Sequence, residues 1–249
     1  MQNFDGASSS MNTSVFAVDG VVFDLDGTLV DSCEDIAQAA NFCLNAAGFP
    51  PRSSAEIQTF IGDGSRLLLA RASGLEPNDE RLDEMLERFF VYYTAHAVDH
   101  TTLLPGAREV LAALAHLPRG LCTNKPRVTT LALLEGLGID GMFDVVVAAG
   151  DVLHHKPHPA PLQRASELLG VSLERLVLVG DGPQDVECAR AAGARSIGIT
   201  EGIIVPLERL HAAGPDALMA LRDVPAQIAS WRSSAGVVEH PAPETPRSA

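Results

Sequence analysis

The chain has 249 residues and a mass of 26.3 kDa, which is enough for one domain with an insert and a sizeable hydrophobic core. Hydrophobic residues make up 46% of it and the mean hydropathy is +0.13, which excludes a largely disordered or fibrous protein. The formal net charge of -14 would repel nucleic acid and anionic lipid, so we expect neither as a partner.

The sequence carries no pattern typical of export or of a membrane anchor. No apolar run reaches the roughly 18 residues of a membrane span, and no Lys or Arg precedes Arg52, whereas signal and transit peptides carry basic residues. We therefore predict a cytoplasmic protein without a membrane partner. Scattered cysteines without a Cys-x-x-Cys pair are typical of reduced thiols. They are Cys33, Cys43, Cys122 and Cys188.

Short apolar runs alternate with helix-length segments through most of the chain. The runs with the character of buried strands are residues 21–25, 120–123, 145–149, 176–180 and 196–200. Each is followed by a turn and a segment long enough for a helix. The alternation predicts an α/β fold, a doubly wound parallel sheet with helices on its faces.

Residues 33–103 break this alternation. They contain no strand pattern, and their apolar residues recur with the period of a helix. The helical patterns lie at 36–46, 67–72 and 80–97. We therefore predict a small α-helical domain inserted after the first strand.

This insert divides the predicted α/β core into two parts, residues 15–32 and 104–231. Residues 1–14 are rich in Ser and Asn, and residues 232–249 are rich in Pro and Ser. Neither end shows a helical or strand period, so we predict flexible tails.

The first motif with chemical character is the run Asp-Leu-Asp-Gly-Thr after the first strand. Side chains two residues apart share a face of an extended chain, so Asp24 and Asp26 project together from the strand's carboxyl end, where parallel sheets bind ligands. Gly27 then turns the chain. Two adjacent carboxylates repel each other unless a hard cation lies between them or one keeps its proton. Either condition points to catalysis.

The ends of later strands carry groups that suit an anion. Thr123, Asn124 and Lys125 bring a hydroxyl, an amide and an ammonium together before a helix, although Thr-Asn is also an ordinary helix cap. Lys125 and Lys156 are the only two lysines of the chain, and both fall in strand-end loops. A lysine there supplies a compact positive charge where an anion and carboxylates meet.

A fourth strand end supplies two more acids. Asp181 follows the strand 176–180, and Asp185 falls in the first turn of the next helix, where it would also suit the helix dipole alone. Because the carboxyl ends of parallel strands lie on one rim, we expect all four loops to form a single site. Its acids can hold Mg²⁺, and its hydroxyl and ammonium groups can hold a phosphate.

These four motifs, in this order, resemble those of the haloacid dehalogenase superfamily, over residues 15–225. The resemblance implies that Asp24 attacks phosphorus and forms an aspartyl-phosphate, and that Asp26 protonates the leaving alcohol and then activates water. It implies phosphate contacts for Thr123 and Lys156. Dehalogenases and phosphonoacetaldehyde hydrolases of the superfamily lack an acid at the place of Asp26, so its presence implies phosphate esters.

The same resemblance implies a magnesium ion. Its ligands would be the carboxylates of Asp24 and Asp181 and the backbone carbonyl of Asp26, with Asp185 as a support of the metal shell. One departure is visible, because members commonly have Ser after Gly-Asp and this chain has Gly182. The hydroxyl contact that such a Ser would make near the metal is absent here.

The helical insert resembles the cap of the superfamily's phosphoglycolate phosphatase and β-phosphoglucomutase branch, which closes over the substrate and excludes water. Residues 62–66 would form its substrate loop, with Gly64 for flexibility and Arg66 free to meet a second anionic group. Asn124 and Lys125 are further predicted substrate contacts. A surface arginine on a helix is the alternative interpretation of Arg66.

Together these features predict a Mg²⁺-dependent phosphoric monoester hydrolase acting on a small phosphorylated metabolite. Thr-Asn-Lys-Pro at 123–126 and Lys-Pro-His-Pro-Ala-Pro-Leu at 156–162 resemble bacterial phosphoglycolate phosphatases, which implies 2-phosphoglycolate as the substrate. The alternatives are a β-phosphoglucomutase-like mutase and a pyrophosphate or nucleotide phosphatase. A receiver-like phospho-signalling module is an alternative of a different class. We expect a monomer or a homodimer.

Overall fold

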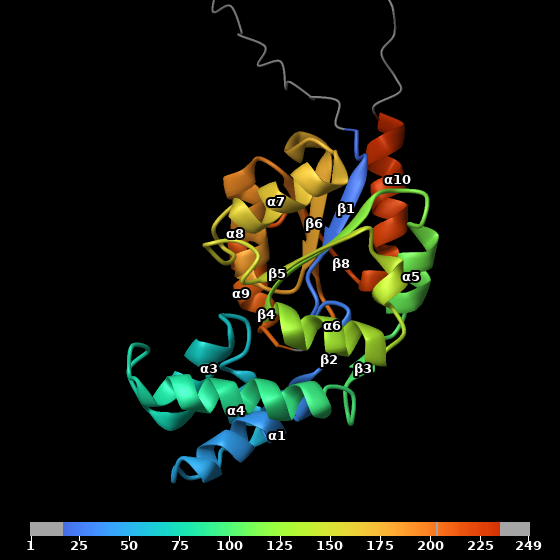
Figure 1. The fold of residues 1–249 in the computed structure, drawn as a ribbon. Coiled ribbons are helices and arrows are strands. Elements are labelled where there is room, and N and C mark those ends of the chain that lie inside the picture. Colours follow the sequence, from blue (N-terminus) through green and yellow to red (C-terminus); the bar gives the residue numbers. More distant parts are fainter. Residues whose placement is uncertain (1–16, 203, 235–249) are drawn as a thin grey trace, which may run out of the picture.

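A computed structural model of the chain describes residues 17–202 and 204–234 (Figure 1). At its centre is a six-stranded sheet in the order β5-β4-β1-β6-β7-β8, with every neighbouring pair parallel. The strands are β1 (Gly20–Phe23), β4 (Arg119–Pro126), β5 (Val145–Ala149), β6 (Leu176–Gly180), β7 (Arg195–Ile199) and β8 (Ala217–Met219). This sheet confirms the predicted α/β fold.

Five of the six strands correspond to predicted ones. The sixth, β8, lies at the edge of the sheet beside β7 and spans three half-buried residues. Three apolar residues are too short a run to show the pattern of a buried strand. The sequence therefore does not predict it.

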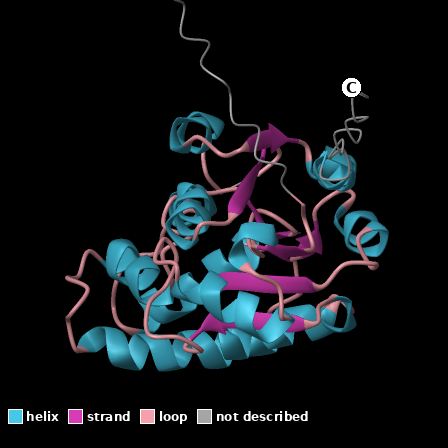
Figure 2. Cartoon of the chain, turned by 90° about the horizontal axis from the view of Figure 1, so that it is seen from above, coloured by secondary structure: helices cyan, strands magenta, loops and turns pink. Residues whose placement is uncertain are grey.

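Helices cover both faces of the sheet (Figure 2). Side chains alternate along β1, so Val21 and Phe23 pack on one face and Val22 on the other. The first face is covered by α5 (Ala107–Ala113), α6 (Arg127–Gly136) and α10 (Val224–Ser234), and the second by α7 (Ala160–Leu169) and α8 (Pro183–Ala192), with α9 (Leu207–Ala213) beside α8. This is the predicted doubly wound arrangement.

The described part of the core also contains three single turns of 3-10 helix. They are η1 (Asp140–Met142), η2 (Leu173–Arg175) and η3 (Leu221–Asp223). Helix α10 continues to Ser234, past the predicted start of the C-terminal tail at residue 232. The predicted N-terminal tail, residues 1–14, and the rest of the predicted C-terminal tail lie outside the described residues.

A helical cap is inserted after β1 and lies across the carboxyl end of the sheet (Figure 1). It contains α1 (Cys33–Ala46), α2 (Ser54–Gln58), α3 (Ser65–Ser73) and α4 (Arg81–Ala95). The two chain crossings into it form a small antiparallel pair, β2 (Val30–Asp31) with β3 (Thr102–Leu103). The prediction of no strand in 33–103 is wrong at β3, because two paired residues leave no periodic pattern.

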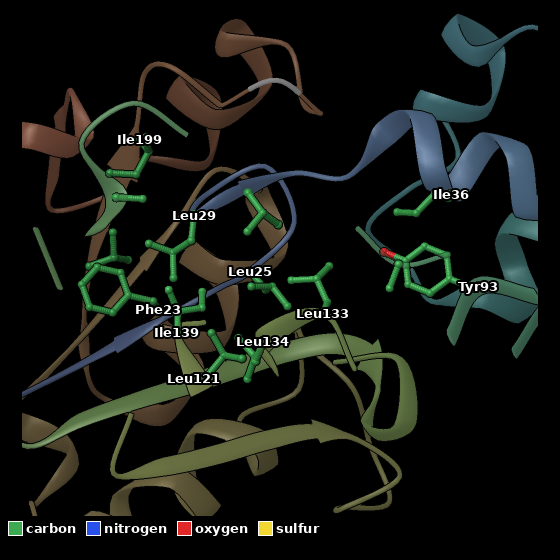
Figure 3. Packing of buried hydrophobic residues seen from close by; sticks show 14 of the residues in the cluster. Phe23, Leu25, Leu29, Ile36, Tyr93, Leu121, Leu133, Leu134, Ile139 and Ile199 are labelled. Atoms are coloured by element: carbon green, nitrogen blue, oxygen red, sulfur yellow. The ribbon is translucent and has the colours of Figure 1, made fainter. Parts of the chain in front are cut away.

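Hydrogen bonds join the two ends of the cap at its base. The carboxylate of Asp35 in α1 accepts hydrogen bonds from the backbone N–H groups of His100 and Thr101 and from the Thr101 hydroxyl, at 2.7–3.0 Å. Cap residues such as Tyr93 also belong to the same buried cluster as Phe23 of the sheet (Figure 3). These contacts hold the cap over the ends of the strands.

No helix in the described part of the chain combines the length and the apolar character that crossing a membrane requires.

Candidate active site

The first motif forms a tight turn directly after β1. The backbone N–H of Asp24 still donates to Val179 of β6, which fixes the start of the turn at the centre of the sheet. Gly27 has φ +84, a left-handed conformation that favours glycine. The side chain of Asp24 is only 9% exposed, at the floor of a pocket between sheet and cap.

Lys156 orients the carboxylate of Asp24 from the loop before α7. Its Nζ lies 2.8 Å from Asp24 Oδ1, 2.6 Å from Asp185 Oδ1 and 2.7 Å from the carbonyl oxygen of Cys122. Burial lowers the pKa of Lys156, but the charges of Asp185 and Asp24 outweigh it and raise that pKa well above its ordinary value. The ammonium therefore stays protonated and all its three N–H groups have acceptors.

Asn124 holds the loop that carries Lys156. Its amide exchanges two hydrogen bonds with the backbone of Lys156, both at 2.9 Å, and also donates to the carbonyl oxygen of Gly62 in the cap at 3.0 Å. Asn124 lies in β4 and thus joins the Lys156 loop and the cap loop to the sheet. It lines the pocket, and its amide group is already engaged in these contacts.

Asp24, Asp181 and Asp185 form a buried acidic cluster in which one oxygen of each lies within 4.8 Å of the others. Burial raises the pKa of Asp24 to about 6 although Lys156 opposes the shift. Burial and the charges of Asp24 and Asp185 raise the pKa of Asp181 well above its usual range. Three such acids repel each other, and a cation among them removes the cost of their charges.

The contacts of Asp181 indicate whether a metal ion fits this cluster. Its Oδ1 accepts from the Thr28 hydroxyl at 3.0 Å, but its buried Oδ2 has no hydrogen-bond partner among the described residues. A buried carboxylate oxygen without a donor is costly unless a cation binds it. Oxygen ligands of this kind suit Mg²⁺, so the residues present fit the predicted ion.

Gly27 and Gly202 make room for the Asp181 carboxylate. A Cβ at Gly27 would lie 2.3 Å from Asp181 Oδ2, and one at Gly202 would lie 2.4 Å from Asp181 Cβ. Both distances are far below van der Waals contact. The backbone thus leaves a space that only glycine can leave here, and the Asp181 carboxylate occupies it.

We expect Gly27→Ala to lower stability and to disable the site. The left-handed φ costs an L-residue about 1–2 kcal/mol, and the added methyl group displaces the Asp181 carboxylate. Gly138→Ala is the matched control, because Gly138 has φ +61 but open space around its Cβ position. Urea unfolding should show a lower free energy of unfolding in both variants, whereas the rate of phosphate release should fall only in Gly27→Ala. Equal activities would contradict the role of this glycine.

Asp26 turns its carboxylate away from the acidic cluster. It accepts a hydrogen bond from the Ser32 hydroxyl at 2.5 Å and faces Lys125 Nζ, which lies 3.1 Å from Oδ1 and 3.2 Å from Oδ2. The carboxylate therefore lies outside the three-acid cluster. Of Asp26, only the backbone carbonyl predicted as a metal ligand remains a candidate for that role.

The pocket brings most of the predicted site residues together. Those that line it are Asp24, Asp26, Gly64, Thr123, Asn124, Lys125, Lys156 and Asp181. Thr123 accepts from the backbone N–H of Lys125 at 3.1 Å, which leaves its hydroxyl hydrogen free to donate. Asp185 does not line the pocket, because it lies behind Lys156 and also accepts from the backbone of Gly182.

Arg66 is not brought to this pocket. Its Nη1 lies 2.6 Å from Asp83 Oδ1, and its Nε donates to the carbonyl oxygen of Pro77 at 2.7 Å, both on the outer side of the cap. The helix α3 begins at Ser65, so its next residue turns toward α4 rather than toward the strands. This geometry favours the alternative interpretation of Arg66 as a surface residue.

We expect Arg66→Ala to leave KM unchanged within about twofold for every phosphate ester. The ion pair it loses is exposed, so the free energy of unfolding should fall by at most about 1 kcal/mol. Steady-state kinetics and urea unfolding check both statements. A tenfold rise in KM for a substrate with two anionic groups would show instead that Arg66 reaches the pocket.

Gln184 is a pocket residue that the sequence interpretation did not single out. A Cβ at Gly182 would lie 2.3 Å from its amide group, and one at Gly62 would lie 3.3 Å from its Nε2. Gly182 thus leaves space for the amide group of Gln184. An uncharged polar residue beside Asp185, in the first turn of α8 after Gly182, is the signal that could have identified it.

This architecture, a parallel sheet with a helical cap and acids at its carboxyl end, is that of a capped α/β hydrolase. Residues 21–199 match the model of the haloacid dehalogenase-like hydrolases, and the chain belongs to that family. The predicted family and enzyme class are therefore confirmed.

Among its relatives are proteins known as phosphoglycolate phosphatases. The one from Pectobacterium atrosepticum is 38% identical over 208 residues, which cover 82% of this chain and 88% of that protein. The one from Escherichia coli K12 is 37% identical over 205 residues, 74% and 81% of the two chains. The crystal structure of a predicted phosphoglycolate phosphatase from Haemophilus somnus 129PT superposes with a TM-score of 0.77 at 28% identity, covering 85% of this chain and 98% of that one.

Proposed function

We propose that the protein is a Mg²⁺-dependent phosphatase that hydrolyses 2-phosphoglycolate to glycolate and phosphate through an aspartyl-phosphate. The observation that carries the proposal is the Asp24 carboxylate, which Lys156 orients at the floor of a capped pocket beside the partnerless Asp181 Oδ2. A nucleophile, a cation site and an enclosed space are the three parts that phosphoryl transfer to a carboxylate needs.

Asp24 is the proposed nucleophile. Its pKa of about 6 keeps most of the carboxylate ionised at neutral pH and above, so an oxygen is free to attack phosphorus. Lys156 and the Thr123 hydroxyl lie at the same floor and would bind the phosphoryl oxygens. Mg²⁺, when held by Asp24, Asp181 and the Asp26 carbonyl, would neutralise charge on the transferring group.

Asp26 is the proposed acid and base. Its carboxyl group would give a proton to the leaving ester oxygen, so that glycolate departs as an alcohol. The same group would then take a proton from the water that hydrolyses the aspartyl-phosphate. The cap covers the pocket during these steps and limits the access of bulk water.

The choice of 2-phosphoglycolate rests on the relatives, whose name gives that substrate, and on the small pocket beneath the cap. Because the chain belongs to the haloacid dehalogenase-like hydrolases, we no longer consider the receiver-like alternative. No feature of the pocket favours the mutase or the pyrophosphate and nucleotide phosphatase. The cytoplasmic location, the lack of nucleic-acid or membrane partners and the monomer or homodimer remain predictions.

A phosphate-release screen tests this function. It compares 2-phosphoglycolate with sugar phosphates, nucleotides and pyrophosphate in Mg²⁺, with Asp24→Asn as the inactive control. We expect kcat/KM for 2-phosphoglycolate to exceed the others by at least about tenfold. A higher kcat/KM for another ester would identify that ester as the substrate instead. Conversion of β-glucose 1-phosphate to glucose 6-phosphate would establish the mutase.

A further inference from the structure

Lys125 is a buried cation of the pocket that lies outside the acidic cluster. Its side chain is 6% exposed, and its ammonium faces both carboxylate oxygens of Asp26. Against the effect of burial, the charge of Asp26 raises the pKa of Lys125 above its ordinary value. A protonated ammonium is thus held beside the group proposed to meet the ester oxygen.

The cap packs against the other side of the Lys125 ammonium. Lys125 Nζ lies 4.4 Å from the centre of the Tyr93 ring, a cation–π contact between the core and α4. Tyr93 is fully buried, and its hydroxyl has no hydrogen-bond partner among the described residues. The hydrogen bonds of the ammonium to Asp26 use two of its three N–H groups, which leaves one for a further anion. Lys125 is therefore preorganised to bind a further anion.

The charges around the pocket single out Lys125 for that anion. Among the described residues that line the pocket, Lys125 and Lys156 are the only cations. Lys156 lies at the Asp24 carboxylate, where it is the proposed partner of the phosphoryl oxygens, and the guanidinium of Arg66 is bound to Asp83 outside the pocket. A second negative group of a substrate would therefore meet Lys125.

We propose that Lys125 recognises a carboxylate one carbon away from the ester oxygen, so that the site selects phosphate esters of 2-hydroxy acids. This inference deepens the proposed function and rests on it. In such esters a single carbon separates the carboxylate from the ester oxygen. A substrate with its ester oxygen at Asp26 brings its carboxylate close to the ammonium 3.1 Å from Asp26 Oδ1.

Tyr93 is a positioning residue in this arrangement. It would act on the substrate only by positioning Lys125. Because its ring belongs to the cap, the contact between the ring and the ammonium exists only when the cap lies on the core. The Asn124 contact to Gly62 joins cap and core at the same pocket. Carboxylate recognition is thereby linked to the closed position of the cap.

The test is a selectivity ratio, kcat/KM for 2-phosphoglycolate divided by kcat/KM for ethyl phosphate, which has the same chain without the carboxylate. Lys125→Met keeps most of the side chain and removes its charge. We expect the ratio to fall by about 10- to 100-fold, as for the loss of a hydrogen bond between charged groups. Lys125→Arg should restore part of it, and Arg66→Met, which removes a cation outside the pocket, should leave it unchanged.

An equal loss for both esters would overturn the proposal, because Lys125 would then act only through Asp26. Tyr93→Phe keeps the ring and should keep the ratio, whereas Tyr93→Leu should lower it together with a rise in KM for 2-phosphoglycolate. An unchanged ratio in Tyr93→Leu would exclude the positioning role.

A measurement on the unmodified protein covers the case in which the Lys125 variants do not fold. It compares 2-phosphoglycolate with its neutral amide, 2-phosphoglycolamide, and we expect at least about a tenfold preference for the carboxylate. A ratio near one with good phosphate release overturns the inference but leaves a phosphatase. Absence of phosphate release from every ester overturns the proposed function as well.

Discussion

Asp24→Asn is expected to lower kcat by about 10⁴-fold or more, because an amide oxygen cannot replace the attacking carboxylate. The substitution keeps the size of the side chain. It also keeps an acceptor for Lys156 Nζ, which lies 2.8 Å from Asp24 Oδ1 in the unmodified protein. It also removes one charge from the acidic cluster, so the folded protein should not lose stability. Single-turnover phosphate release measures the effect without interference from product release.

The control for this prediction is thermal unfolding together with circular dichroism. A variant with normal secondary structure, an unchanged or higher Tm and no turnover supports Asp24 as the nucleophile. A folded variant with activity near that of the unmodified protein would mean that phosphorus is attacked by another group, and the aspartyl-phosphate mechanism would be wrong.

The sequence predicts the site well where backbone geometry alone decides the outcome. Asp24, Lys156 and Asp181 each follow a strand of the parallel sheet or lie in a loop after one, and Thr123 lies in the C-terminal half of β4, so topology brings all four to one edge. No detail of side-chain packing is needed for this inference. The same reason explains why five strands and the helical cap are predictable from apolar periodicity.

The sequence predicts side-chain direction less well. Arg66 belongs to the predicted substrate loop, but the start of α3 at Ser65 decides that its guanidinium meets Asp83. The ring of Tyr93 beneath the ammonium of Lys125 joins residues 32 positions apart, and only the docking of cap on core creates that contact. Contacts between domains leave no local signal in the sequence, so motif spacing cannot reveal them.

Binding of Mg²⁺ is expected to raise the Tm by about 5–10 °C when its concentration is 100-fold above Kd. A ligand at that excess stabilises the folded state by about 2.7 kcal/mol, and one kcal/mol corresponds to about 2–4 °C in a chain of this size. Chelation by EDTA should remove both the shift and the phosphatase activity. Differential scanning fluorimetry with and without MgCl₂ measures the shift.

The size of this shift should depend on pH, and its sign follows from the acidic cluster. Without metal, the raised pKa values of Asp24 and Asp181 stabilise the folded state below the ordinary carboxyl pKa, and for Asp24 this stabilisation is lost as pH rises through about 6. Mg²⁺ binds the ionised carboxylates and competes with protons. The Mg²⁺-dependent rise in Tm should therefore be larger at pH 8 than at pH 5.

Asp181→Asn tests whether Mg²⁺ raises the Tm by binding at the acidic cluster or through a general effect of salt. It removes one of three mutually repelling charges and replaces the partnerless Oδ2 by a neutral group. Because the repulsion falls, the metal-free variant should be no less stable at pH 8 than the unmodified protein, yet Mg²⁺ should no longer raise its Tm. A shift of the same size in Asp181→Asn would show that Mg²⁺ acts elsewhere on this acidic chain, and the cluster would then not be its site.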